Sequence, residues 1–293
     1  MIDGFLVINK PVGMTSHDVV QRVRKWAKQR RVGHLGTLDP MATGVLPIAL
    51  GEATKLSRLL THGDKSYSAR IRLGVETTTY DREGEVVHET AEPWPEREQI
   101  EKALEHFRGE IDQTPPPFSA VKVDGQPSYR RARRGEEFQL EPRRVRLDRV
   151  ELVGYEPPVF SVEVECSAGT YLRSIAHDLG RALGTGAHLW ELIRTRSGPF
   201  LLSQALSLEE LDACGQERVI PMAAATGLPT YEVDARTCRR VGNGVQLGRH
   251  EIKGAPPQGI LQLVRKGRLA ALVEARLGIP ELRTLRVFLE GTK

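Results

Sequence analysis

The acidic residue best placed for chemistry is Asp39, within residues 33–44, which read GHLGTLDPMATG. The glycines permit tight turns and close backbone approach, and Pro40 disfavours a helical conformation at Asp39. A carboxylate held on such a turn can act as a nucleophile or a base. Taken alone, however, these residues favour a structural interpretation, in which Asp39 caps a helix that begins at Pro40. The local sequence leaves both interpretations open.

Signatures of several other enzyme classes are missing from the sequence. The segment around Asp39 lacks the Gly-Lys-Ser/Thr end of a P-loop, so nucleotide hydrolysis has no support. No HExxH or GxSxG motif occurs anywhere in the chain. The GNG run at residues 242–244 is too isolated to indicate a dinucleotide-binding fingerprint.

Further short motifs follow one another over the first 200 or so residues. They are NKPVGMTS at 9–16, KSY at 65–67, SAVK at 119–122 with an arginine-rich stretch after it, GTYLR at 169–173, and GAHL at 186–189 with Leu192 and Arg194. With residues 33–44 and their continuation VLPIALGEATK, these motifs resemble the TruB and dyskerin branch of pseudouridine synthases, and the bacterial TruB form in particular. The sequence has no long lysine-rich tail, which disfavours a dyskerin-like, guide-dependent protein.

The resemblance implies that the protein converts uridine 55, in the T loop of tRNA, to pseudouridine. It implies that Asp39 is the catalytic carboxylate, Arg173 its cationic partner, and Tyr67 the ring on which the flipped base stacks. His34 would fill the space that the base vacates, and Leu192 would form an apolar wall of the uracil pocket. The remaining implied residues are the supports Lys10 and Tyr171, and the RNA-gripping Lys122, Arg130, Arg131 and Arg134 of a thumb at about 115–145.

Pseudouridine formation makes few chemical demands on a protein. The bond from ribose C1′ to uracil N1 breaks and a bond from C1′ to C5 forms, so we expect no cofactor and no metal. A glycosidase generally needs two carboxylates, whereas the acids nearest to Asp39 along the chain are Asp18 and Glu52. Burial in a pocket that excludes water would raise the pKa of Asp39, and the Arg173 cation would offset this. Attack on C1′ and removal of a proton from C2′ both remain open as routes.

Other interpretations compete with this one. Tyr67 could be a strand tyrosine packed in the core, Arg173 a surface arginine, and His34 a loop histidine bonded to backbone. The thumb arginines could belong to a flexible surface excursion. A non-catalytic RNA-binding or remodelling module would share the basic thumb and tail, and a nucleosidase would release free uracil. Tritium release from uridine C5 and analysis of the product distinguish the three.

Hydrophobic periodicity predicts the elements that must position these residues. It predicts strands at 5–8, 67–73 and 159–166, and a helix after the capping box of Thr15 and Asp18. A second helix is predicted over 171–183, with Gly184 just past its end, and a short one after the capping box of Ser207 and Glu210. Residues 100–111 fit one face of a helix, and residues 32–51 are expected to form a loop.

The implied fold class is α+β, a pseudouridine synthase fold. It has a long mixed, mostly antiparallel sheet flanked by helices, in a catalytic domain of residues 1–228. After Pro229 the sequence pattern becomes mainly strand-like. Strand-like runs occur at 230–233, 259–264 and 269–273, with a hairpin turn at Lys266 and Gly267. We therefore expect a small, mainly β, PUA-like RNA-binding domain at 229–293.

Composition limits the partners and the compartment. The 293 residues carry a formal net charge of +4, which permits a polyanionic partner without requiring one. The three cysteines are far apart and form no CxxC pair, which disfavours a disulfide framework or a zinc site. Neither a signal peptide nor an apolar run long enough to span a bilayer is evident. We expect a cytoplasmic monomer that binds the tRNA T arm, with no membrane and no obligate protein partner.

Overall fold

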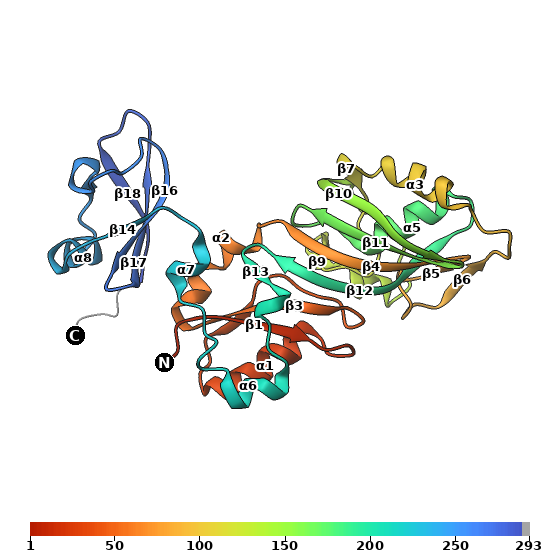
Figure 1. Cartoon of the computed structure of the whole chain (residues 1–293), viewed down its shortest axis with the longest axis horizontal. Helices are drawn as coiled ribbons and strands as arrows, with labels where there is room; N and C mark the ends of the chain where they lie inside the picture. The colour runs from red at the N-terminus through yellow and green to blue at the C-terminus, as the bar shows by residue number, and fades with distance from the viewer. Residues whose placement is uncertain (289–293) are drawn as a thin grey trace.

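The computed structural model describes residues 1–288 and contains two larger β-sheets joined through a short helix (Figure 1). Within those residues the first sheet has nine strands, and its main path follows the order β1-β3-β12-β4-β11-β10-β7. Strand β2 pairs with β3, and β13 pairs with β12. The bounds are β1 Gly4–Lys10, β2 Val32–His34, β3 Thr43–Leu50, β4 Lys65–Leu73, β7 Gly109–Gln113, β10 Arg143–Glu156, β11 Val159–Cys166, β12 Ala187–Ser197 and β13 Phe200–Leu201.

Neighbouring strands of this sheet are antiparallel with one exception, the parallel pair of β3 and β12. The predicted fold class, a mixed and mostly antiparallel sheet, is therefore confirmed. The parallel pair matters for the site, because it sets Arg194 of β12 opposite Gly44 of β3. Strand β4 lies on the other side of β12 and places Tyr67 opposite the same Arg194.

Helices cover the apolar face of the sheet. Helices α1, α3, α5 and α6 contribute Val19, Ile100, Ile175 and Leu211 to one buried cluster with the inward side chains of β1 and β4. The helix bounds are α1 Ser16–Ala27, α2 Ser57–Thr61, α3 Arg97–Glu105, α4 Ser128–Ala132, α5 Leu172–Ala182, α6 Leu208–Cys214, α7 Met222–Thr226, α8 Ala235–Gly242, and the 3-10 helices η1 Gly51–Leu56, η2 Leu202–Gln204 and η3 Arg249–Glu251. No helix within residues 1–288 combines the length and apolar character needed to cross a membrane.

The helix ends follow the local sequence signals. The Thr15 side chain accepts from the Asp18 amide while the Asp18 carboxylate accepts from the Thr15 amide, which completes the predicted capping box of α1. The same reciprocal bonds join Ser207 and Glu210 at α6. Past the end of α5, Gly184 adopts a left-handed φ of 73°, as its predicted position requires.

The second sheet comprises β14-β16-β17-β18-β15 and lies at the end of the long axis, beyond α7 (Figure 1). Its turn has positive φ at Lys266 and Gly267, as predicted for a two-residue hairpin. Leu272 and Phe288 from this sheet share a buried cluster with Ala225 of α7 and Phe5 of β1. The bounds are β14 Thr230–Glu232, β15 Leu247–Gly248, β16 Gly259–Arg265, β17 Arg268–Ala275 and β18 Glu281–Val287.

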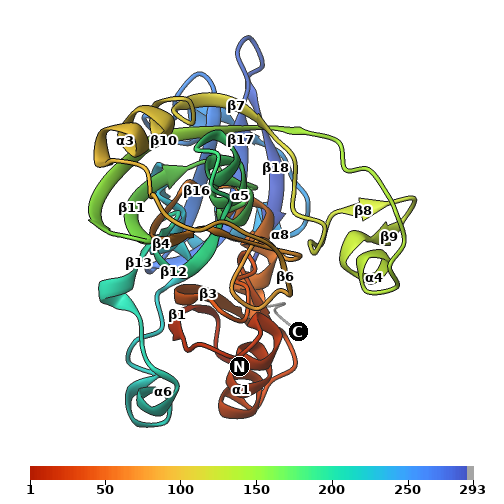
Figure 2. The ribbon, with the colours of Figure 1, turned by 90° about the vertical axis from the view of Figure 1, so that its right-hand side faces the viewer.

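Two smaller hairpins project from the first sheet. Strands β5 (Val75–Thr77) and β6 (Val86–Glu89) form one of them. Strands β8 (Lys122–Val123) and β9 (Gln126–Pro127) form the other, which continues into α4 and stands away from both sheets (Figure 2). We refer to residues 115–142 as the thumb.

Three expectations about elements were wrong in part. Residues 32–51 are not one loop, because β2 and β3 occupy most of the segment; β3 is buried on both faces and so shows no alternation in sequence. The helix expected over 100–111 ends at Glu105, and Ile111 lies on β7 after Gly109 takes a positive φ. The thumb, expected to extend to about residue 145, ends earlier, because β10 begins at Arg143.

Candidate active site

Asp39 lies on the short loop that connects β2 to β3. Ser16 fixes this loop from α1, because its hydroxyl accepts from the Leu38 amide at 2.8 Å and donates to the Leu38 carbonyl at 3.1 Å. Pro40 and Met41 form a turn, closed by the Ala42 amide on the Asp39 carbonyl at 3.1 Å. No helix follows, so the interpretation of Asp39 as a helix cap is wrong.

Arg173 meets Asp39 from the first turn of α5. Its Nε lies 2.9 Å from Asp39 Oδ2, and its Nη2 donates to Asp39 Oδ1 at 3.1 Å. The Arg173 side chain is only 7 % exposed, whereas that of Asp39 is 34 % exposed. The structure thus brings together two residues that are 134 positions apart, as the resemblance led us to expect. It does not enclose Asp39 in the expected dry pocket, because the loop presents one side of the carboxylate to solvent.

A second carboxylate, Asp81, shares the same guanidinium. It lies 3.6 Å from Arg173 Nε on the loop between β5 and β6, and its side chain is 6 % exposed. The Thr79 hydroxyl donates to Asp81 Oδ1 at 2.6 Å, and the Glu83 amide donates to it at 3.0 Å. Sequence reasoning missed Asp81, since its only local signal is a polar turn, 42 positions from Asp39 along the chain.

Arg173 also holds two backbone segments. Its Nη1 donates to the Thr79 carbonyl at 3.2 Å and to the Phe118 carbonyl at 3.1 Å. Phe118 lies at the base of the thumb, so one side chain joins the catalytic loop, the Asp81 loop and the thumb. A guanidinium suits this task because it presents five donors in a rigid plane.

Arg194 of β12 is a second buried arginine, with only 1 % of its surface exposed. Its Nε donates to the Val45 carbonyl at 2.8 Å, Nη2 to Gly36 at 3.0 Å and Nη1 to Thr37 at 3.3 Å. No carboxylate lies within 4.0 Å of it among residues 1–288. Its backbone touches β3 so closely that a Cβ on Gly44 would lie 2.3 Å from the Arg194 carbonyl oxygen. Arg194 belongs to one of the motifs that carry the family resemblance, but the sequence alone predicts no role for it.

Tyr67 and Leu192 lie on the same face of the sheet as Arg194. Tyr67 is 6 % exposed and Leu192 is 7 % exposed. Burial raises the pKa of the Tyr67 hydroxyl to about 12, and the nearby Arg194 charge partly opposes this shift. The phenol therefore remains neutral at physiological pH. Both side chains belong to the main apolar cluster. At this place a side chain can therefore pack in the core and also form one wall of a pocket.

Lys10 supports the Asp39 loop from the end of β1. Its Nζ donates to the carbonyls of Pro11 at 2.8 Å, Met14 at 2.7 Å and Pro40 at 3.1 Å. The side chain is fully buried, and this burial lowers the pKa of the ammonium to about 8, with Asp39 opposing the shift. Lys10 thus holds the backbone carbonyl of Pro40, the residue that follows Asp39.

His34 and Tyr171 flank the site at the ends of β2 and α5. His34 is half-buried, its pKa is lowered by burial and then by Arg194, and its Nδ1 has no hydrogen-bond partner among residues 1–288. Tyr171 precedes α5, where the Gln113 side chain accepts from its amide at 2.8 Å and donates to its carbonyl at 3.1 Å.

The basic residues of the thumb fall into two groups. Arg131 pairs with Asp124 at 3.0 Å and with Glu136 at 2.9 Å, and Arg134 pairs with Glu136 at 2.6 Å. Lys122 and Arg130 are exposed and have no carboxylate within 4.0 Å among residues 1–288. The Arg130 guanidinium lies 5.9 Å from the Tyr129 ring. The four residues predicted to grip RNA are therefore near one another, but two of them are already engaged inside the thumb.

Family models match most of the chain. The model for the TruB family pseudouridylate synthase, N-terminal domain, matches residues 24–172, which is just over half of the sequence. The model for the tRNA pseudouridylate synthase B C-terminal domain matches residues 173–219. The chain belongs to the TruB family. Asp39 lies in the first matched segment and Arg173 opens the second, so their ion pair joins the two.

Curated TruB relatives match nearly end to end. The tRNA pseudouridine synthase B of Solibacter usitatus is 44 % identical over 283 residues, covering 94 % of this chain and 97 % of the relative. That of Symbiobacterium thermophilum is 50 % identical over 248 residues, covering 83 % of each chain. Among solved structures, a Cbf5-Nop10-Gar1 complex includes a chain that is 28 % identical, with a TM-score of 0.75, covering 98 % of this chain and 85 % of that one.

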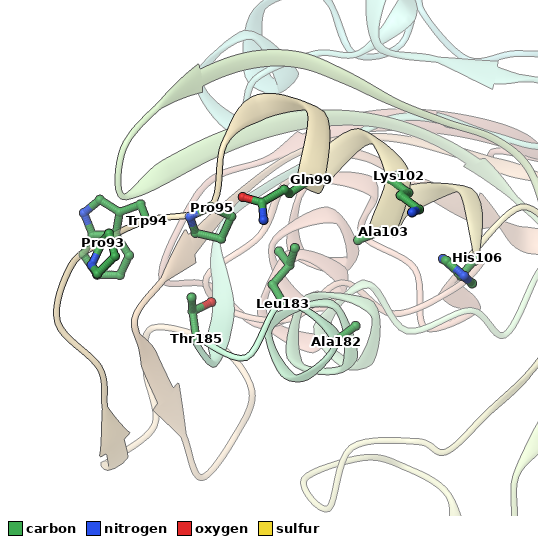
Figure 3. Close-up of a pocket in the computed structure, with 10 residues that line it drawn as sticks. All are labelled: Pro93, Trp94, Pro95, Gln99, Lys102, Ala103, His106, Ala182, Leu183 and Thr185. Carbon is green, nitrogen blue, oxygen red and sulfur yellow. The ribbon is translucent and has the colours of Figure 1, made fainter.

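One surface pocket of this TruB-family chain lies away from Asp39. It has a volume of about 560 Å³ and lies between α3 and the end of α5, lined by Trp94, Lys102, His106 and Leu183 among others (Figure 3). None of the expected site residues lines it. Within residues 1–288, no group of three or more His, Cys, Asp or Glu side chains is arranged to hold a metal ion.

Proposed function

We propose that this TruB-family chain isomerises uridine 55 in the T loop of tRNA to pseudouridine, with Asp39 as the catalytic carboxylate. The observation that carries the proposal is the contact between Asp39 and Arg173, in which the Asp39 side chain remains 34 % exposed. The two contacts to the guanidinium orient the carboxylate. The open side leaves room for the sugar of an extruded nucleotide.

The reaction is a rearrangement within one nucleotide. Asp39 acts on the ribose as the C1′–N1 bond breaks, either at C1′ or at the C2′ proton. The uracil turns without leaving, and C5 bonds to C1′ as the Asp39–C1′ bond breaks or as Asp39 returns the proton to C2′. The C5 proton then departs to solvent, and N1 takes up a proton from solvent. The proton lost from C5 is matched by the proton gained at N1, so the product is an isomer of the substrate. The reaction therefore draws on no redox partner. Asp81 would keep Arg173 in position while Asp39 engages the ribose.

Base recognition would use side chains on the face of β4 and β12. Flipping a uridine costs a few kcal/mol, and stacking on an aromatic ring returns about 1–3 kcal/mol per base. Tyr67 and Leu192 would contact the flipped uracil, and His34 would enter the space that it vacates. Lys10 and Tyr171 would hold the loop and the start of α5 that frame this pocket.

Binding of the T arm would rely on the thumb and on the second sheet. Lys122 and Arg130 are exposed, have no carboxylate within 4.0 Å among residues 1–288, and would contact phosphates directly. Arg131 and Arg134 would mainly keep the thumb folded, because Asp124 and Glu136 already neutralise them. Residues 229–293 would add a PUA-like contact to the RNA. The proposal extends to a cytoplasmic monomer that needs no protein partner, and this part rests on the family resemblance.

The test is a T-arm RNA that carries tritium at uridine C5. The proposal predicts tritium release by the wild-type chain and none by Asp39→Ala, with both proteins binding the RNA comparably. Binding without release by the wild type would indicate a non-catalytic RNA-binding module instead. Free uracil in the product would indicate a nucleosidase.

A further inference from the structure

Helix α5 meets the Asp81 loop through two side chains, not one. Arg173 and His177 are four residues apart on α5, so they lie one turn apart on the same face. Arg173 contacts Thr79 and Asp81 of the loop, as described above. His177 contacts the residue between them, Tyr80. The polar contact and the aromatic contact therefore act on three consecutive loop residues.

The contact between Tyr80 and His177 is a parallel ring stack. The ring centroids are 3.8 Å apart and the planes differ by 5°. His177 is 8 % exposed, and its Nδ1 has no hydrogen-bond partner within residues 1–288. Burial lowers the pKa of this imidazole, which favours its neutral form. His177 thus serves the loop as an aromatic surface and not as a hydrogen-bonding group.

Tyr80 reaches this stack from an unfavourable backbone conformation. Its φ is 64°, in the left-handed region where a bulky side chain is uncommon. The backbone is fixed there by the Leu189 amide of β12, which donates to the Tyr80 carbonyl at 3.0 Å. Such strain persists only where surrounding contacts over-determine it, and it concentrates at functional sites. Here the conformation turns the Thr79 carbonyl and the Asp81 carboxylate toward Arg173 while the Tyr80 ring covers His177.

The hydrogen bonds inside the loop cannot hold the loop at a fixed distance from α5. Thr79 and the Glu83 amide fix the shape of the turn around Asp81, but both belong to the loop itself. They leave the separation between loop and helix unset. Besides the Arg173 contacts themselves, the ring stack sets that separation, because two flat rings in contact cannot approach further and lose attraction when they part.

We propose that Tyr80 and His177 are positioning residues that hold the Asp81 loop against α5 and so keep Arg173 aligned on Asp39. The inference rests on the proposed function, since alignment of Arg173 matters only if Asp39 is catalytic. Misplacement of a catalytic group by about 1 Å can cost about 10²-fold in rate. Loss of the stack should therefore slow the chemical step more than it weakens RNA binding.

The experiment measures single-turnover rate constants at saturating enzyme, together with the Kd for the T-arm RNA. Tyr80→Gly removes the ring and also relieves the backbone strain. We expect it to lower the rate constant at least about tenfold, with Kd changed less than about twofold. Tyr80→Phe keeps the ring and should remain within about twofold of wild type. His177→Leu should behave like Tyr80→Gly, and the double variant should be no slower than either single one.

Tyr155→Ala is the matched control, because it removes a partly buried tyrosine ring that packs against the main apolar cluster and donates to the Pro95 carbonyl, outside the Asp81 loop and α5. It should lower the thermal midpoint and leave the rate constant unchanged. Wild-type rates in both Tyr80→Gly and His177→Leu would overturn the inference, as would an equal loss in Tyr80→Phe. If either Tyr80→Gly or His177→Leu does not fold, the rate constant of the other variant tests the inference. An inactive wild-type chain would instead overturn the proposed function.

Discussion

At the scale of single residues, the site divides its work between two buried arginines. Arg173 contacts two carboxylates, Asp39 and Asp81, and so controls charge. Arg194 donates hydrogen bonds to backbone carbonyls of the Asp39 loop and β3, with no carboxylate within 4.0 Å among residues 1–288, and so fixes the shape of the loop. Replacing Arg173 should therefore mainly lower the reaction rate, whereas replacing Arg194 should mainly lower the free energy of unfolding.

Arg173→Lys keeps the positive charge but loses the planar fork that spans Asp39, Thr79 and Phe118. We expect the single-turnover rate constant to fall about 10²-fold, while RNA affinity changes little. The thermal midpoint should also fall, because the carbonyls of Thr79 and Phe118 lose a donor. Arg173→Ala should be at least as slow. A rate within twofold of wild type for Arg173→Ala would contradict the assigned pairing.

Arg194→Met removes the donor that serves the carbonyls of Gly36, Thr37 and Val45. Buried carbonyls without a partner cost about 1–3 kcal/mol each, so we expect the free energy of unfolding to drop by at least about 2 kcal/mol. Chemical denaturation measures this change. Unchanged stability in Arg194→Met would show that water or a relaxed loop replaces the guanidinium at no cost.

At the scale of elements, the thumb is a small folded unit with its own polar core. The Ser128 hydroxyl donates to the Ser119 carbonyl at 2.9 Å and accepts from the Ser119 amide at 3.3 Å, which closes its base. Arg131 and Glu136 close its far side. Only the cations left outside these pairs are available to phosphates.

Arg130→Gln and Arg134→Gln form a matched pair within the thumb. If Arg130 contacts a phosphate, its loss weakens T-arm binding and reduces the slope of log K against log salt by about 0.7–0.9. Arg134→Gln should leave that slope nearly unchanged, because Glu136 already neutralises the arginine. Titrations at several salt concentrations measure both. Equal slopes in the two variants would refute the division of the thumb cations.

At the scale of the whole molecule, two buried lysines make stability depend on pH. Lys10 and Lys65 are almost entirely buried, and burial lowers the pKa of each ammonium from 10.5 to about 8. Above pH 8 the folded chain releases these protons while the unfolded chain keeps them. The unfolded state then binds more protons, so the free energy of unfolding rises with pH. Burial raises the pKa of Cys166 from 9.0 to about 11, which opposes the rise above pH 9.

We therefore expect the free energy of unfolding to increase between pH 8 and pH 9, by about 1 kcal/mol for each lysine. Lys65→Met should remove about half of the increase, whatever its effect on absolute stability. Lys102→Met, at an exposed position on α3, is the control and should keep the full increase. Denaturant titrations at the two pH values measure the difference, and an unchanged increase in Lys65→Met would contradict this assignment.

The sequence predicted elements better than it predicted contacts. Capping boxes at Thr15 and Ser207 and the alternation in β4 and β11 are local signals, and each led to the right element. Strand β3 was missed because it is buried on both faces and contains Pro47, so it shows neither alternation nor a clean apolar run. The pairing of Asp39 with Arg173 came from the family motifs, since nothing local links residues 134 positions apart.

Asp81 and Arg194 show what sequence reasoning lacked. Asp81 sits in a polar turn that reads as an ordinary hairpin loop, and its importance comes only from the approach of α5. Arg194 reads as a charged strand residue, yet it is among the most buried side chains in the chain. The sorting of thumb arginines into those with and those without a carboxylate partner likewise depends on where Asp124 and Glu136 fold back.

The most direct measurement compares wild type with Asp39→Asn, which preserves the shape of the side chain and removes its charge. Pseudouridine is mapped in the T-arm RNA after a single turnover at saturating enzyme, and RNA affinity is measured in parallel. We predict no product with Asp39→Asn, affinity within about twofold of wild type, and complete conversion by the wild type at uridine 55. Pseudouridine formed by Asp39→Asn at a rate near that of wild type would contradict the account.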